Sequence, residues 1–296
     1  DRQFGTKTTV AKMTDVPGHT IAILEPMADA GIQYLHIGVN PACMVPQVPE
    51  VFRWRHNGRE LVVHYSGGYG APLSIEGFDE AIEFAHTGDN MGPQDAQQVL
   101  DELARIQALY PNAQVQASTL DDFASSLLKI KDRLPIVEEE IGDTWIHGVG
   151  SDPWKVSRFQ ELLHLMDRWL AEGLITQDSE AYDHFMMNLM LVAEHTWGLN
   201  FEVFLADYIN WRKTDFQKAR IADRTTLDFV NPRDSHIRAM IEGVAKRRKQ
   251  VPFEGSYRYY ESSFAEQREY LYRALQKLPL PLKEEAESAM DALSPH

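Results

Sequence analysis

The spacing of apolar and polar residues divides the chain into two regions with different periodicities. From about Thr8 to Glu140, short runs rich in β-branched residues alternate with helical patterns. The runs predict strands over Thr8–Thr14, Gln33–Val39, Glu60–Tyr65 and Ala113–Ala117, with a weaker candidate at Leu134–Val137. The patterns between them predict helices over Ile21–Ala30, Ile75–Ala85, Pro93–Leu109 and Thr119–Lys129. This alternation favours a parallel sheet with crossover helices, in which chemistry sits at the carboxyl ends of the strands.

From Pro153 onward, apolar residues recur at intervals of three and four, which is typical of amphipathic helices. Four such stretches are predicted to be helical, and they cover Val156–Leu170, Tyr182–Ala193, Phe201–Asp215 and Phe264–Leu278. Pro279 and Pro281 are expected to end the last of them. Long helices joined by short loops pack as a bundle. We therefore expect an α/β domain over residues 1–150, and a helical bundle with a C-terminal helical segment over residues 151–296.

Composition narrows the classes of protein to consider. The chain has 296 residues, of which 44% are hydrophobic and 25% charged, as in ordinary globular proteins. Its formal net charge of −15 argues against a nucleic-acid partner, and the basic run at 246–249 is more typical of a solvated helix end. The single cysteine, Cys43, excludes an intramolecular disulfide and a cysteine-based zinc cage. No apolar run approaches the ~20 residues of a membrane span. We expect a soluble protein, with the cytoplasm favoured.

The first candidate for chemistry is the segment Thr14-Asp15-Val16-Pro17-Gly18-His19-Thr20, between a predicted strand and a predicted helix. An acid in such a loop can serve as nucleophile, base or metal ligand, because the helix N-terminus favours its anionic form. Asp15 is therefore a candidate catalytic residue. The structural alternative is that Asp15 and Thr20 only organise the turn and cap the helix.

Three further segments carry acids, histidines or tryptophans. Asp89 lies on a glycine-bracketed loop before a helix, where it or Asn90 could instead cap that helix. Three glutamates at 138–140 are ordinarily a solvated face, but Asp143, Trp145 and His147 follow them and favour a pocket that binds sugar hydroxyls and stacks on a sugar ring. His195 ends a predicted bundle helix, where a histidine is more often a core or capping residue than a metal ligand.

Taken together, these segments resemble the family 38 glycoside hydrolases, the retaining α-mannosidases. The resemblance spans roughly residues 8 to 215. In that family an Asp-x-x-Gly-His-Ser/Thr loop after a strand carries the nucleophile, and Asp15, Gly18, His19 and Thr20 are similar to it. A later glycine-Asp loop ending in Gly-Pro carries the acid/base, and residues 88–93 look like it.

The resemblance implies a fold, a reaction and a cofactor. The fold would be a distorted parallel β/α barrel followed by a helical bundle. Asp15 would be the nucleophile and Asp89 the acid/base, and His19, Asp143, Trp145 and His147 would bind the carbohydrate substrate. Zinc would be held by Asp15 and His195 together with further ligands, and would grip two hydroxyls of the sugar.

The chain also departs from the family pattern. No His-x-Asp pair, which binds zinc in that family, occurs in the first strand region, so we expect an N-terminal strand to be missing from this sequence. Two ligands alone would not hold zinc tightly. Two alternatives therefore stay open beside the glycosidase: a non-catalytic carbohydrate-binding or interaction module that kept the fold, and a metal-dependent deacetylase-like hydrolase. Pattern and composition leave the oligomeric state open.

Overall fold

The computed structural model describes residues 5, 7–16, 18–41, 43–87, 91–193, 195 and 198–294, except for the side chains of residues 147–149. The chain forms two compact units, Asp1–His147 and Gly148–His296. The boundary between them falls close to the change in hydrophobic periodicity near residue 150. A 3₁₀ segment, η3 (Thr144–Ser151), runs through this boundary.

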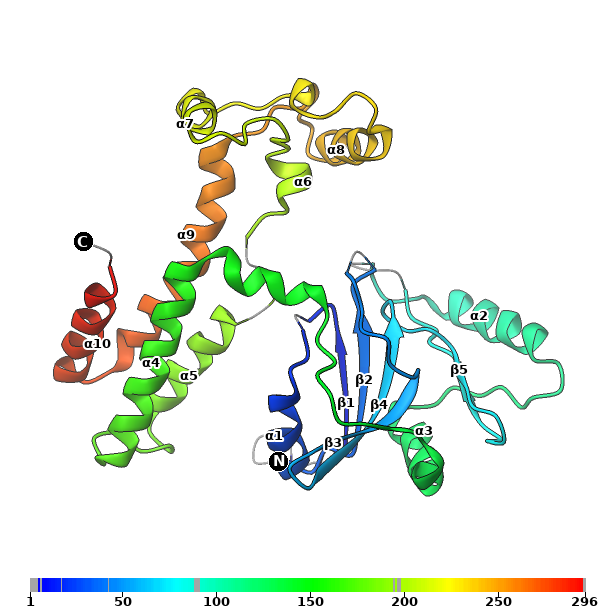
Figure 1. The fold of residues 1–296 in the computed structure, drawn as a ribbon. Coiled ribbons are helices and arrows are strands. Elements are labelled where there is room, and N and C mark those ends of the chain that lie inside the picture. Colours follow the sequence, from blue (N-terminus) through cyan, green and yellow to red (C-terminus); the bar gives the residue numbers. More distant parts are fainter. Residues whose placement is uncertain are drawn as a thin grey trace. The chain divides into compact units, whose positions relative to one another are not determined.

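A five-stranded sheet forms the centre of the first unit (Figure 1). Its strands lie in the order β1 (Val10–Thr14), β2 (Tyr34–Val39), β4 (Arg59–Gly67), β3 (Val51–His56) and β7 (Ile136–Val137). The predicted strands at β1, β2 and β4 are confirmed, and the weak candidate at Leu134–Val137 is confirmed over its last two residues. Because all six residues of β2 are buried, this strand lies in the core of the unit.

The sheet is mixed rather than wholly parallel. β1 runs parallel to β2 and β2 parallel to β4, whereas β3 is antiparallel to β4 and parallel to β7. The pattern did not predict β3, although Asn57 and Gly58 form the two-residue turn before β4 with φ of 46° and 75°. Such a turn needs positive φ at both positions, and Asn-Gly meets that need. None of the described strands closes the sheet into a barrel, and the distorted β/α barrel stays a prediction.

The two faces of the sheet are covered by different elements. One apolar cluster holds Leu35, Ile37, Val63 and Trp54 together with Leu24 of helix α1 (Leu24–Asp29). On the other face, a second cluster joins strand residues to Phe123, Ala124 and Leu127 of helix α3 (Leu120–Leu127). The 3₁₀ turns η1 (Ile21–Ile23) and η2 (Leu128–Arg133) adjoin these helices. Helix α2 (Ala96–Leu109) buries only Ile106.

Side-chain caps explain where the helices of this unit begin. Thr119 and Asp122 form a capping box at the start of α3, and Asp95 and Gln98 do the same for α2. The helices predicted over 21–30, 93–109 and 119–129 are therefore confirmed, with α2 starting three residues after Pro93. Thr20 caps η1, as the structural alternative from the sequence had it, because its hydroxyl accepts a hydrogen bond from the Ala22 N–H.

Two predicted elements of this unit are wrong. Ile75–Ala85 is not a helix but contains most of a short hairpin, β5 (Leu73–Ser74) with β6 (Ala81–Ile82). Gly77 adopts φ +71°, which interrupts a helix, while Ile75, Phe78 and Ile82 still pack on the α3 side of the core. Ala113–Ala117 is not a strand. It is a mostly exposed connection between α2 and α3 and belongs to neither of the two sheets that the described residues form.

Four helices form the bundle of the second unit: α4 (Pro153–Ala171), α5 (Glu180–Val192), α9 (Tyr257–Ala274) and α10 (Leu280–Ala292). They share one core, which includes Trp169, Phe185, Leu271 and Met290. The turn η5 (Leu275–Lys277) connects α9 to α10. Helical structure resumes directly after Pro279, which is the N-cap of α10. Proline is tolerated at the start of a helix. No helix among the described residues is long and apolar enough to cross a bilayer.

A smaller helical group lies between α5 and α9 in the sequence. It comprises α6 (Phe201–Phe204), α7 (Lys213–Ala222), the turn η4 (Leu227–Phe229) and α8 (Ser235–Arg247). The helix predicted over Phe201–Asp215 is wrong. It ends after one turn because Ala206 adopts φ +55° and the Asp207 carboxylate accepts the N–H groups of Ile209 and Asn210. Those side-chain bonds compete with helical ones.

Candidate functional site

Asp15 lies directly after β1, at the carboxyl edge of the three parallel strands. Its N–H donates to the carbonyl of Gly38 at 3.1 Å, so it continues the pairing with β2 by one residue. Its φ of 57° then turns the chain away from the sheet. Aspartate and asparagine adopt this left-handed conformation more readily than other non-glycine residues. Thr20, not Asp15, is the N-cap of η1. Asp15 is therefore placed by the sheet rather than by helix capping.

Asn40 holds the Asp15 carboxylate from the next strand. Its Nδ2 donates to Asp15 Oδ1 at 2.8 Å and to the hydroxyl oxygen of Tyr69 at 3.2 Å. Asn40 follows β2 and Tyr69 follows β4, so three adjacent strand ends contribute one side chain each. A bond from a neutral amide to a carboxylate is charge-assisted and fixes the rotation of the acid. The sequence interpretation missed Asn40 and Tyr69, although both follow strands that it predicted.

A row of basic side chains supports these strand ends from within the sheet. Lys12, His36 and His64 are direct neighbours across β1, β2 and β4. Lys12 Nζ donates to the carbonyl of Tyr69 at 2.8 Å and lies 3.1 Å from His36 Nδ1. It also lies 5.0 Å from the centre of the Phe84 ring. Lys12 therefore ties the loop that carries Tyr69 to β1.

The two histidines of this row are fully buried and neutral. His36 Nε2 lies 3.2 Å from Ser66 Oγ, and His64 Nδ1 lies 3.1 Å from the Tyr34 hydroxyl. Burial is the largest cause that lowers the pKa of His36 to about 3, and electrostatic repulsion with His64, Lys12 and His86 contributes to the same value. Burial, with Lys12, lowers the pKa of His64 to about 4. Because Lys12 is a donor, His36 Nδ1 is the acceptor and Nε2 carries the hydrogen.

The loop after Asp15 packs against the segment that carries Asp143 and Trp145. A Cβ on Gly18 would lie 2.8 Å from Ile146 Cβ, so only glycine permits this approach. Glu140 joins the same two segments, since its carboxylate accepts the Thr20 hydroxyl at 3.1 Å and the Ile21 N–H at 2.7 Å. Glu140 thus caps η1, and the glutamate run at 138–140 is more than a solvated face.

His19 and Asp143 belong to these two segments, and both are buried. Their exposed fractions are 3% and 5%. Asp143 Oδ1 accepts the backbone N–H of Trp145 at 2.7 Å, while Asp143 Oδ2 and both ring nitrogens of His19 have no hydrogen-bond partner among the described residues. Burial lowers the pKa of His19, and the Asp143 charge opposes this effect. Burial also raises the pKa of the nearby Cys43 thiol, and Asp143 and Asp15 add to the rise.

The structure describes the remaining predicted site residues only in part. Asp89 and its neighbours Gly88 and Asn90 lie outside the described residues, as does the side chain of His147. Trp145 is half-buried within η3. His195 is half-buried and follows α5 in the second unit, whereas Asp15 belongs to the first. The expectation that His195 and Asp15 share a metal therefore stays a prediction.

The donor set of the first unit does not by itself fit a zinc site. Within the described residues, no group of three His, Cys, Asp or Glu side chains could hold a metal ion. A catalytic zinc takes three protein ligands. Near Asp15, Cys43 has a raised pKa and so a disfavoured thiolate, and a hydrogen bond from Asn40 already engages one Asp15 oxygen. Zinc stays a prediction that needs ligands beyond this set.

The comparison with protein families concerns the helical unit. Residues 149–296, half of the chain, match the family described as a domain of unknown function, DUF5054. The chain belongs to the DUF5054 family. The DUF5054 match begins within η3 and covers the whole bundle and the smaller helical group, whereas Asp15, Asn40 and Tyr69 lie before it. No curated protein matches the chain. The resemblance to family 38 glycoside hydrolases thus rests on the residues given above.

Proposed function

We propose that this protein is a retaining glycoside hydrolase whose nucleophile is Asp15. One observation carries the proposal: the Asp15 carboxylate is fixed by Asn40 at the edge where three parallel strands end. Chemistry in such sheets is placed at this edge because the loops there converge on one region. The substrate class, an α-mannoside or a related sugar, comes from the family resemblance.

The reaction would proceed by double displacement. The Asp15 carboxylate attacks the anomeric carbon, the bond to the leaving oxygen breaks, and a covalent glycosyl ester forms. Water then attacks the same carbon, the ester bond breaks, and Asp15 is released as a carboxylate. Asp89 is proposed to protonate the leaving oxygen and then to deprotonate the water. A retaining enzyme needs about 5–5.5 Å between the two carboxyl groups.

The surroundings of Asp15 suit a nucleophile because they hold its carboxylate in one orientation. The Asn40 amide donates to one carboxylate oxygen, and a fixed orientation is what an attack on the anomeric carbon requires. Lys12 holds the backbone of Tyr69, whose hydroxyl accepts from the same Asn40 amide. His19 and Asp143 would shape the sugar subsite from below, while Trp145 and His147 would line it. These roles follow the family resemblance, and the packing of Gly18 on Ile146 supports them by joining the two segments.

A fluorinated α-mannosyl fluoride tests the proposal directly. Fluorine on the ring slows both displacement steps, while the anomeric fluoride is a good leaving group that keeps formation of the covalent ester fast, so the intermediate accumulates. Incubation with the protein, expressed from its complete reading frame, is expected to add one fluorosugar to the peptide that contains Asp15. Peptide mass spectrometry locates the label. A label on Glu140 or Asp143 instead, or no label at all, would contradict the assignment of Asp15.

A second prediction concerns Asn40. Asn40→Ala removes the amide that orients the carboxylate, and hydrogen bonds to charged groups contribute about 1.5–3 kcal/mol. We expect kcat/KM for an aryl α-mannoside to fall by about tenfold to a hundredfold, with most of the loss in kcat. The rate of labelling by the fluoride should fall in parallel. The exposed Asn112, between α2 and α3, offers the control Asn112→Ala. Equal effects of the two substitutions would show that Asn40 has no role in orientation.

A further inference from the structure

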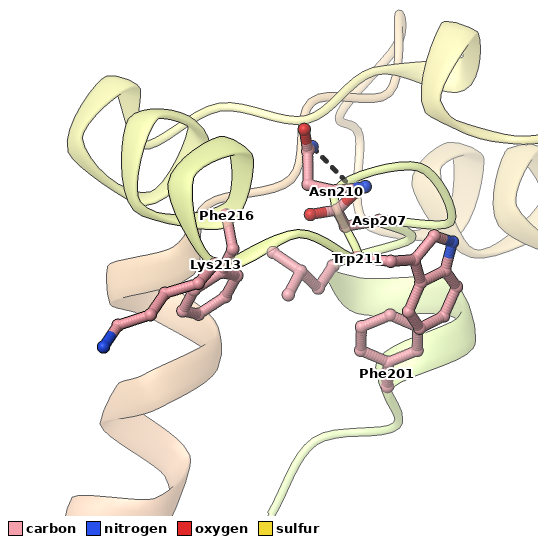
Figure 2. A pocket seen from close by; sticks show the side chains of 7 residues that line it. Phe201, Asp207, Asn210, Trp211, Lys213 and Phe216 are labelled. Atoms are coloured by element: carbon pink, nitrogen blue, oxygen red, sulfur yellow. Dashed lines mark hydrogen bonds between the residues drawn. The ribbon is translucent and has the colours of Figure 1, made fainter.

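The second unit contains an aromatic cavity that the proposed hydrolysis does not use. It has a volume of about 440 Å³, and Figure 2 shows its lining. Phe201 and Trp211 lie on one side, Phe216 and Lys213 on the other, and Asp207 with Asn210 lies between the two. Leu205 completes the lining. Small-molecule sites are typically concave, apolar and about 300–1,000 Å³, with a few placed polar groups.

The walls of the cavity are held in place by other rings. Phe201 packs edge-on against Tyr208 with centroids 5.7 Å apart, and Phe216 packs edge-on against Tyr257 at 5.8 Å. Trp211 Nε1 donates to the carbonyl of Tyr208 at 2.8 Å. That bond fixes the indole, yet 75% of Trp211 is exposed. A large, fixed and exposed aromatic face offers contact area at little cost in conformational entropy.

The carboxylate in the lining, that of Asp207, already has hydrogen-bond partners within the protein. The Asp207 carboxylate is 6% exposed and accepts hydrogen bonds from the Tyr257 hydroxyl, the Asn210 amide and two backbone N–H groups. Burial and the Asp207 charge raise the pKa of Tyr257, so it stays a donor. A carboxylate with these partners is satisfied within the protein. Asn210 is the neutral polar side chain of the lining, whereas the ammonium of Lys213 extends away from the cavity (Figure 2).

We propose that this cavity binds a neutral pyranose ring. The C–H face of a pyranose is flat and apolar and suits an aromatic wall, while its hydroxyls suit the amide of Asn210. A cationic ligand such as a quaternary ammonium fits less well, because Asp207 is already paired and Lys213 repels it. A purely apolar ligand would offer the Asn210 amide no hydrogen-bond partner beyond Asp207. The site would bind a sugar chain independently of hydrolysis at Asp15.

The experiment follows fluorine signals in the complete protein labelled with 5-fluorotryptophan. The chain has 6 tryptophans, and the Trp211 signal is identified by its loss in Trp211→Phe. Titration with methyl α-mannoside, methyl β-glucoside and their disaccharides is expected to shift this signal with a Kd of about 1–10 mM, typical of small weak ligands. Trp211→Ala and Phe216→Ala should each weaken binding at least tenfold, as judged by saturation transfer to the sugar.

Matched variants separate this site from the proposed active site. Ile221→Ala, an 81% exposed position of α7 outside the cavity, should leave binding unchanged, and so should Asp15→Asn. Circular dichroism should show the same helix content in all variants. The inference is overturned if no sugar shifts the Trp211 signal, if tetramethylammonium binds more tightly than the sugars, or if Asp15→Asn abolishes a binding that Trp211→Ala leaves intact. Sugar binding without hydrolysis would support this site and contradict the proposed reaction.

Discussion

Asp15→Asn is expected to lower kcat/KM for an activated aryl α-mannoside by about 10³-fold or more, because a neutral amide cannot form the glycosyl ester. The substitution is suited to the backbone. Asparagine tolerates the left-handed φ of 57° as well as aspartate does, so the loop should keep its path. Release of the aryl alcohol by the protein from its complete reading frame measures the rate, and NMR of the first product reports retention at the anomeric carbon.

Two further variants test whether the loss of activity arises because Asp15 is the nucleophile. Asp15→Gly also fits a positive φ and leaves room for a small anion. Added azide should restore turnover in Asp15→Gly by attacking the anomeric carbon, and the product should be a glycosyl azide of inverted configuration. Asp79→Asn removes an exposed acid near the β5–β6 hairpin and should keep full activity. Wild-type rates in Asp15→Asn, or the absence of azide rescue, would remove Asp15 from the nucleophile role.

Acidification from pH 7 to pH 5 is expected to destabilise the first unit strongly through His36 and His64. In the unfolded chain these histidines take up protons near pH 6.5, whereas in the folded unit their pKa values are about 3 and about 4. The unfolded state therefore binds more protons below pH 6.5, and the stability present above that pH is lost as the pH falls toward 4 and 3. At pH 5 the loss is about 2 kcal/mol for each histidine.

Urea unfolding followed at Trp54 measures this loss. Trp54 is fully buried in β3, so its fluorotryptophan signal reports the first unit alone. Replacing one titrating group, as in His64→Gln, should roughly halve the difference in unfolding free energy between pH 7 and pH 5. His236→Gln, at an exposed position of α8, should leave it unchanged. A pH dependence that is the same in His64→Gln and in the wild type would show that the buried row is not its source.

The features that were predicted best are those that depend on residues close together in the sequence. The strand before Asp15 and the helix that begins after Thr119 are each set within a few positions, and the structure contains them. The helical periods of α4 and α5 were similarly clear, because each helix buries a continuous face in the bundle.

The errors share a physical cause, which is that apolar spacing does not record backbone conformation. Ile75, Phe78 and Ile82 have helical spacing, yet Gly77 bends them into a hairpin that buries the same side chains. Ala206 and Asp207 end a helix that the apolar pattern would have continued. Asn40 illustrates the limit for the candidate site, since its role depends on the pairing of β2 beside β1, which no local pattern specifies.

The mixed pairing of the sheet also bears on the order in which the first unit assembles. β3 and β4 are joined by two residues, so their hairpin can close within about 1–10 μs. The parallel pairs of β2 with β4 and of β1 with β2 must close longer loops, which costs more chain entropy. Asp15 and Asn40 meet only when β1 pairs with β2. A folding chain would therefore form this hairpin first and bring Asp15 and Asn40 together after it, before β7 and Glu140 close the longest loops.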